Sequence, residues 1–408
     1  MAERGQGRAH GFLRNATSWA RACPRSGDVP LGGQCRGGSR KRGGTPMTMA
    51  PVPLVTAALQ RPQELVAYTL RQWEDLVHQA RRANVLSRIA HSLGELGFLP
   101  RVPPAPRAHL EAALVMAQAQ TEAVEREVAF LRKALATIGV DLVLLKGAAY
   151  LIAGLPAARG RVFSDVDILV PFAKLAEVEA ALMLHGWTTT HQNAYDQRYY
   201  RQWMHELPPL RHNVRMTVLD VHHAILPLTA RLKPDSTKLF AASRPIGDKG
   251  RLRVLCPADM VLHSATHLFH NDDLSQGLRD LADLDSLLRH FGSEPGFWED
   301  LPRRAAELDL ARPLYYGLRY ASRYLGTPVP SDTRRRADVG RPPRIAVRLM
   351  DALYDRALRP VAPSDAGSLT PLSRHALYVR AHWLRMPPLL LAWHLGVKAL
   401  RREEVTAQ

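Results

Sequence analysis

The stretch Arg161-Val-Phe-Ser-Asp-Val-Asp-Ile-Leu-Val170 decides the fold of this chain of 408 residues. A short run of mainly apolar residues predicts a buried β-strand. Side chains alternate across a strand, so Asp165 and Asp167 are expected on one face and Val166 on the other. Two carboxylates side by side repel each other, and a divalent cation is the usual way in which a protein neutralises them.

A third carboxylate lies on a second predicted strand, within Val214-Arg-Met-Thr-Val-Leu-Asp-Val-His-His-Ala-Ile225. This acid is Asp220, and a single acid in a strand either binds a metal or pairs with an arginine. Alternation places His222 on the same face as Asp220. His222 therefore either reaches the site or is a core histidine with a partner of its own.

A strand-to-helix turn precedes the acidic stretch. Gly139–Leu145 reads as a short buried strand, and Lys146-Gly147 follows it. The glycine allows close approach of the backbone, the next helix N-terminus favours an anion and the lysine adds a positive charge, so this turn is expected to hold phosphates. Arg159 and Arg161 either contact phosphates too or pair with the aspartates of the acidic strand when no metal is bound.

The order of predicted elements indicates a three-part organisation. Strands and helices alternate over residues 139–256, which predicts an α/β core. Apolar residues at helical spacing predict a helical region at 51–138 and another at 257–408. In the second region, Asp259 is expected to cap a helix N-terminus, and residues 331–343 read as a solvated linker.

Residues 1–50 are rich in Gly, Arg and Ser and are expected to form a disordered basic tail. An alternative is that translation starts at Met47 or Met49. The net charge is +17 with a pI near 10.3. A basic surface suits anionic partners such as nucleotides, phosphorylated substrates or nucleic acid, although arginine-rich surfaces also follow from genome composition. Nucleic acid is not the favoured partner.

The composition, 46% hydrophobic and 23% charged, is that of a soluble globular protein. Three cysteines are too few for a disulfide framework and show no metal-binding spacing, which favours a reducing compartment such as the cytoplasm. The most apolar stretch, residues 386–397, contains prolines and is shorter than the roughly 20 residues that span a bilayer. No membrane span is therefore expected.

Taken in order, three motifs resemble the uncharacterised nucleotidyltransferase family of the DNA polymerase β-like superfamily. They are Leu144-Leu-Lys-Gly-Ala-Ala149, Arg161-x-x-Ser-Asp-Val-Asp-Ile-Leu-Val170 and Leu219-Asp-Val-His-His223. The segment Trp73–Ala80, and the later helix with His263 and His267 followed by Asp280 and Asp283, resemble that family too.

The resemblance implies an α/β (α+β) fold in which a small mixed sheet is flanked by helices. It implies transfer of a nucleoside monophosphate from an NTP, expected to be ATP, to an unknown acceptor, with release of pyrophosphate. The implied catalytic and metal-binding residues, for Mg²⁺ or else Mn²⁺, are Asp165, Asp167 and Asp220. The residues expected at the nucleotide are Lys146, Gly147, Arg161 and Ser164, with Arg159, His222, His263 and His267 as further candidates.

One departure concerns the turn after the first strand. The superfamily usually carries Gly-Ser there, whereas this chain has Lys146-Gly147-Ala148. The missing hydroxyl leaves a contact to the triphosphate unfilled, and Lys146 is the residue expected to replace it.

Two other functions are open at this point. His263, His267 and His270 share a helical face, and with Asn271-Asp272-Asp273 they could form the metal site of a phosphohydrolase. The fold could also serve as a nucleotide-binding module without catalysis. The acceptor of a transferase, whether sugar phosphate, small molecule, protein hydroxyl or RNA end, is expected to bind at residues 187–212 or on the C-terminal helices.

Overall fold

The acidic stretch forms β2 (Val166–Leu169), the middle strand of a mixed sheet. The computed structural model describes residues 54–189, 194–247, 251–359, 369–391 and 393. Within these ranges seven strands pair in the order β3-β4-β5-β2-β1-β7-β6. The other strands are β1 (Leu142–Leu145), β3 (Trp187–Thr189), β4 (Leu210–His212), β5 (Val218–His222), β6 (Arg244–Pro245) and β7 (Leu252–Val254).

The centre of the sheet is buried on both faces. Every residue of β1 and β2 is buried, as expected for strands covered by helices on both sides. β2 runs parallel to β5 and antiparallel to β1, and β1 runs parallel to β7. The prediction of a small mixed sheet built around the acidic stretch is confirmed.

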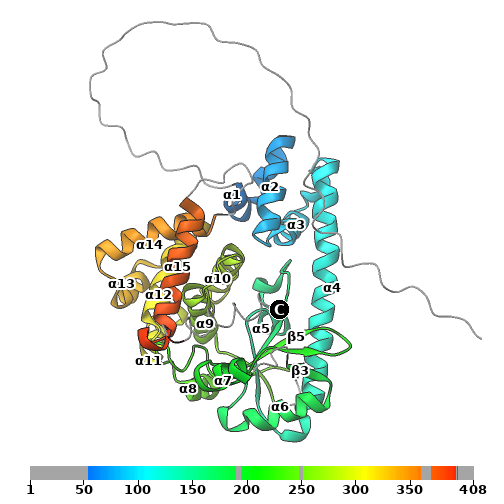
Figure 1. Cartoon of the computed structure of the whole chain (residues 1–408). Coiled ribbons are helices and arrows are strands. Elements are labelled where there is room, and N and C mark those ends of the chain that lie inside the picture. The colour runs from blue at the N-terminus through cyan, green and yellow to red at the C-terminus, as the bar shows by residue number, and fades with distance from the viewer. Residues whose placement is uncertain (1–53, 190–193, 248–250, 360–368, 392, 394–408) are drawn as a thin grey trace, which may run out of the picture. The chain divides into compact units, whose positions relative to one another are not determined.

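Among the described residues, four α-helices precede the sheet: α1 (Leu54–Gln60), α2 (Leu70–Arg82), α3 (Leu86–Glu95) and α4 (Pro104–Leu135). Trp73 and Leu76 on α2 are fully buried in a separate N-terminal core, as their helical spacing predicts. The long helix α4 contacts α2 and α3 as well as the sheet strand β2 (Figure 1). It therefore joins the N-terminal helices to the sheet.

Helices inside the core segment connect the strands. They are α5 (Lys146–Ile152), α6 (Leu175–Leu184), α7 (Ala194–Trp203) and α8 (Ser236–Ala242). The helices after the sheet are α9 (Pro257–His270), α10 (Gly277–Phe291), α11 (Phe297–Glu307), α12 (Ala311–Leu325), α13 (Ser331–Ala337), α14 (Arg344–Ala357) and α15 (Leu369–Arg385).

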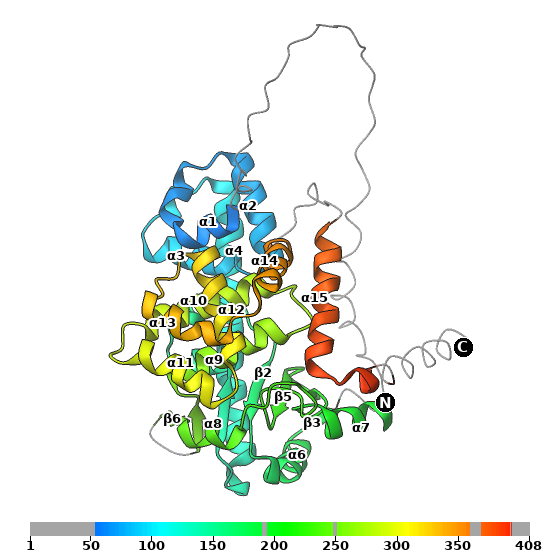
Figure 2. The same cartoon turned by 90° about the vertical axis from the view of Figure 1, so that its left-hand side faces the viewer.

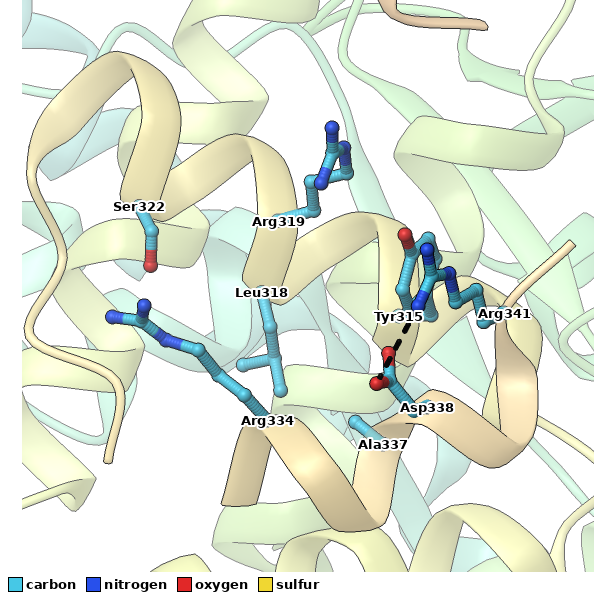
Figure 3. Close-up of a pocket in the computed structure, with 8 residues that line it drawn as sticks. All are labelled: Tyr315, Leu318, Arg319, Ser322, Arg334, Ala337, Asp338 and Arg341. Atoms are coloured by element: carbon cyan, nitrogen blue, oxygen red, sulfur yellow. Dashed lines mark ion pairs between the residues drawn. The ribbon is translucent and has the colours of Figure 1, made fainter. Parts of the chain in front are cut away.

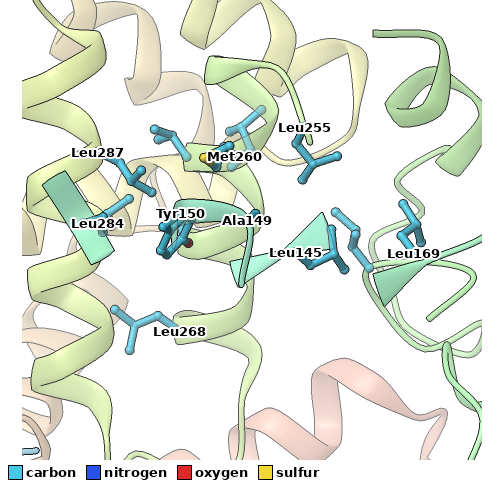
Figure 4. Packing of buried hydrophobic residues seen from close by; sticks show 14 of the residues in the cluster. Leu145, Ala149, Tyr150, Leu169, Leu255, Met260, Leu268, Leu284 and Leu287 are labelled. Atoms are coloured by element: carbon cyan, nitrogen blue, oxygen red, sulfur yellow. The ribbon is translucent and has the colours of Figure 1, made fainter. Parts of the chain in front are cut away.

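Helix α9 is the central helix of the C-terminal region. All of its residues except His267 are buried, because it packs against α10, α11, α12 and α15 and also contacts α5. Figure 4 shows the resulting core, in which Leu145 of β1 and Tyr150 of α5 lie near Met260 and Leu268 of α9 and Leu284 of α10. This packing fixes the turn after β1 against α9.

Two local predictions are wrong. Asp259 does not cap α9, because the helix begins at Pro257; its buried carboxylate instead pairs with Arg304, Oδ1 to Nε 2.7 Å. Residues 331–343 are not a linker throughout, because Ser331–Ala337 form α13. The predicted tail, residues 1–50, lies outside the described residues. None of the described helices is long and apolar enough to cross a membrane.

Candidate active site

The three carboxylates come from the two central strands. Asp167 on β2 and Asp220 on β5 are direct partners in the parallel register. Asp165 lies one residue before β2 begins and accepts a hydrogen bond from Ser164 Oγ over 2.9 Å. The charges of all three carboxylates raise the pKa of Lys146, so all three lie near its ammonium group. The structure therefore places close together the three acids that the family resemblance implies.

Lys146 begins α5 in an unusual backbone conformation, with φ of 46°, which non-glycine residues seldom adopt. Its Nζ lies 2.6 Å from Oδ1 of Asp167. Burial alone would lower the pKa of Lys146, but Asp167 and Asp165 raise it above its usual value. The lysine is thus a fixed cation beside the carboxylates, and strain of this kind is common at functional sites.

His222 holds the same oxygen of Asp167, to which its Nε2 donates over 3.0 Å. Burial alone would raise the pKa of Asp167, but Lys146 and His222 together hold it well below its usual range. Asp167 is therefore a carboxylate in the folded protein. His222 is thus a buried histidine with a partner of its own, and that partner is one of the three candidate carboxylates.

Asp220 has the opposite environment. Its Oδ1 is buried, and none of the described residues donates a hydrogen bond to it. Burial, followed by the charges of Asp167 and Glu206, raises the pKa of Asp220 to about 7. A buried carboxylate oxygen without a donor is costly. A divalent cation between Asp167 and Asp220 would satisfy this oxygen, so the residues present fit the metal that the motif implies.

Two further ionisable side chains lie beside this pair, and the sequence did not single them out. Glu206 Oε2 is 3.2 Å from Nδ1 of His222, and His205 Nε2 is 3.9 Å from the same oxygen. Burial lowers the pKa of His205 well below its usual value, and positive charges on His222 and Arg385 lower it further. A polar stretch before the strand of Asp220 was the only signal for this pair in the sequence.

The two candidate arginines contact other acids than those expected. Arg161 Nε donates to Oδ2 of Asp283 over 2.8 Å, and Arg88 binds the other oxygen of Asp283. Arg159 pairs with Glu95 at 3.1 Å. The alternative that these arginines pair with Asp165 or Asp167 is wrong, because Arg161 pairs with an acid of α10 and Arg159 with an acid of α3.

Gly147 lies against the side chain of Arg161. A side-chain carbon at Gly147 would collide with the guanidinium of Arg161 and touch Phe163. The guanidinium also lies 5.2 Å from the ring centre of Phe163. The glycine therefore lets Arg161 reach Asp283 and so ties α5 to α10.

A polar pocket of about 180 Å³ opens beside the site. Lys146, Ser164 and Asp165 line it from the sheet side, and His267 and Asp280 line it from α9 and α10. His263 is buried nearby, and burial, then Lys146 and His222, lower its pKa to about 3. Among the described residues, two groups of three side chains are placed to hold a metal ion: one is Asp167, Asp220 and His222, and the other is His205, Glu206 and His222. Neither group includes His263, His267 or His270.

Helix α15 contributes a residue that sequence reasoning missed. Arg385 at its C-terminal end binds Asp272 (Nη1 to Oδ1 3.0 Å), just after α9. Its carbonyl accepts a hydrogen bond from Thr229, so the end of α15 lies beside the loop that follows β5 (Figure 2). Burial chiefly, and Arg385 among the nearby charges, lower the pKa values of His205 and His267. Only the fold could bring a residue so late in the chain to this place.

A larger pocket, of about 340 Å³, lies between α12 and α13 (Figure 3). Two of the arginines that line it are paired with acids, Arg319 with Asp351 at 2.6 Å and Arg341 with Asp338 at 3.9 Å. Its lining includes no residue of the sheet. This pocket is therefore larger than the polar pocket but lies apart from the carboxylates of the central strands.

Comparison with known protein families identifies a matching family model. A family model described as "uncharacterised nucleotidyltransferase" matches residues 69–326, which run from the start of α2 to the end of α12. The matched segment contains both central strands and the turn at Lys146. No curated protein matches the chain.

Proposed function

The chain belongs to the uncharacterised nucleotidyltransferase family, and we propose that it transfers a nucleoside monophosphate from an NTP, with ATP the expected donor, to an acceptor nucleophile. One observation supports the proposal above all. Asp167 and Asp220 face each other on adjacent strands, and a buried oxygen of Asp220 has no described donor. Such a pair suits a divalent cation that carries a triphosphate.

The reaction is an in-line displacement at the α-phosphorus. An acceptor oxygen forms a bond to this phosphorus, and the bond from the α-phosphorus to the oxygen that bridges it to the β-phosphorus breaks, so pyrophosphate leaves. Mg²⁺, or Mn²⁺, held by Asp165, Asp167 and Asp220 would neutralise phosphate charge and activate the acceptor. Asp220, whose Oδ1 has no donor among the described residues, would help to remove the acceptor's proton.

The remaining residues position the nucleotide. Lys146 and Ser164 both line the polar pocket beside the carboxylates, where the phosphates are expected. Arg161 lines the same pocket while bound to Asp283, so its charge is held in a fixed place. Arginine held in this way is pre-organised for an anionic ligand.

The proposal is tested by Asp167→Asn. Purified protein would be incubated with each α-labelled NTP, Mg²⁺ and a panel of acceptors, and label transfer and pyrophosphate would be measured. Asp167→Asn is expected to lower transfer at least a hundredfold, because it removes the carboxylate at the centre of the site. Asp141→Asn is the matched control, since Asp141 is a partly exposed acid directly before β1. Equal activity in wild type and Asp167→Asn would rule the proposal out.

The same assay separates the other functions. Release of inorganic phosphate without label transfer would indicate a phosphohydrolase. NTP binding with Mg²⁺ but no turnover on any acceptor of the panel would favour a nucleotide-binding module.

A further inference from the structure

A nitrogen-rich group of side chains adjoins the aspartate pair. His205, Glu206 and His222 each offer a ligand atom, and these three atoms lie within 4.8 Å of one another. His222 also belongs to a second such group, with Asp167 and Asp220. The histidines make the first group chemically different from the all-carboxylate site that the acidic motif implies.

The backbone holds these residues in place. Glu206 forms an isolated antiparallel bridge with His222, and Leu207 N donates to Val221 O over 2.9 Å. The carbonyl of His205 accepts from the backbone N–H groups of His223 and Ala224. All three side chains therefore project from paired backbone at the end of β5, which favours a precise site.

The orientation of His222 is that of a metal-binding histidine. Its Nε2 donates to Asp167, so the other nitrogen, Nδ1, faces Glu206 at 3.2 Å. Histidines that bind metals usually donate their second ring nitrogen to a carboxylate, which fixes the tautomer and the ring. Asp167 has that position here.

The ring of His205 completes the group. Its centre is 5.2 Å from that of His222, and its Nε2 is the ring nitrogen that lies near Glu206. Two atoms that each lie about 2.1 Å from one ion can be no more than about 4.2 Å apart. The distances of 3.2 Å and 3.9 Å from the two rings to Glu206 Oε2 meet this limit.

We propose that His205, Glu206 and His222 bind a divalent transition-metal ion of the Zn²⁺, Mn²⁺ or Co²⁺ class, distinct from an Mg²⁺ held by the aspartates. Two imidazoles and one carboxylate suit these ions, whereas Mg²⁺ prefers oxygen ligands. Three protein ligands leave a coordination position open, as in catalytic metal sites. The ion would add positive charge beside Asp167, on the far side of His222.

The experiment measures binding in the absence of nucleotide, so its result is independent of nucleotidyl transfer. The full chain, freed of metal with a chelator, is titrated with Co²⁺, and the visible absorption of bound Co²⁺ is recorded in the presence of excess Mg²⁺. One equivalent is expected to bind. His205→Ala and Glu206→Gln are each expected to weaken binding at least tenfold. Glu206→Gln preserves the side-chain volume, which guards against misfolding as the cause.

Two further variants locate the ion. His223→Gln, a buried neighbour outside the group, is expected to bind Co²⁺ as the wild type does. Asp220→Asn is expected to retain most of the absorption. The proposal would be overturned if wild type bound Co²⁺ no more tightly than His205→Ala. It would also be overturned if Asp220→Asn alone lost the ion, because the ion would then lie elsewhere.

Discussion

The Nζ atom of Lys146 lies 2.6 Å from Oδ1 of Asp167, the oxygen to which His222 also donates. A lysine and a histidine thus neutralise in part the carboxylate that the motif assigns to a metal. Asp220, its partner across the register, has a buried oxygen that none of the described residues binds. The two carboxylates therefore have different electrostatic environments before any ligand arrives, which lower the pKa of Asp167 and raise that of Asp220.

Lys146→Ala tests the role of this lysine at the nucleotide. The variant removes the cation that lines the polar pocket, so the KM for NTP is expected to rise at least tenfold, a loss of about 1.4 kcal/mol in binding. Steady-state kinetics at saturating Mg²⁺ would measure it. Lys174→Ala, at a partly exposed lysine paired with Glu177, is the control. An unchanged KM would mean that Lys146 does not contact the nucleotide.

Gly147→Ala tests the packing of α5 against Arg161. The added methyl group would collide with a guanidinium that Asp283 holds, so the free energy of unfolding is expected to fall by about 1 to 3 kcal/mol. Gly94→Ala is the matched control, because Gly94 lies in helix α3 with open space around it. It is expected to stabilise the protein by about 0.5 to 1 kcal/mol. Urea unfolding would measure the free energy of unfolding of both variants. Equal changes in the two would contradict a collision between the new methyl group and Arg161.

Asp283→Ala tests the buried pair of arginines. The change leaves Arg88 and Arg161 buried without the carboxylate that both bind. Removing one member of a buried ion pair typically costs about 3 to 5 kcal/mol, and a loss of that size is expected in urea unfolding. Asp300→Ala, at an exposed acid, is expected to change stability by less than about 1 kcal/mol. A small loss in Asp283→Ala would show that the arginines find other partners.

His270 gives the protein a specific dependence on pH. Burial, with Arg380 and Arg385, lowers its pKa to about 3, from 6.5 in the unfolded chain. Between these values the unfolded chain binds a proton that the folded protein does not, so stability is complete above pH 6.5 and falls as pH falls. The contribution of His270 to the slope of unfolding free energy against pH is at most about 1.4 kcal/mol per pH unit. His270→Gln should flatten the wild-type curve of unfolding free energy against pH, and His290→Gln, at an exposed histidine, should not.

The local part of the site could be predicted from the sequence. Alternation along each strand places Asp220 and His222 on one face without knowledge of the rest of the fold, and the family resemblance implies that Asp167 joins them. Contacts between distant segments could not be predicted, because no periodicity encodes them. Arg161 meets Asp283 from α10, and His205 reaches the site through pairing with the end of β5.

A local rule was overridden in one case. Asp259 has the residue type and position of an N-cap, yet α9 begins two residues earlier at Pro257. The carboxylate is fully buried and binds Arg304 on α11. A buried partner from another helix is worth more than a cap at a helix end, so tertiary packing decided the role of this residue.

The spacing of Asp220 and His222 on β5 constrains how this chain can vary over evolution. Val221, the residue between them, is fully buried and faces away from the site. Another apolar residue could replace it, but its deletion would turn His222 to the opposite face of the sheet. Substitution of Val221 by another apolar residue should therefore be tolerated during evolution. Insertions or deletions within β5 should be selected against, because they change the length of the segment.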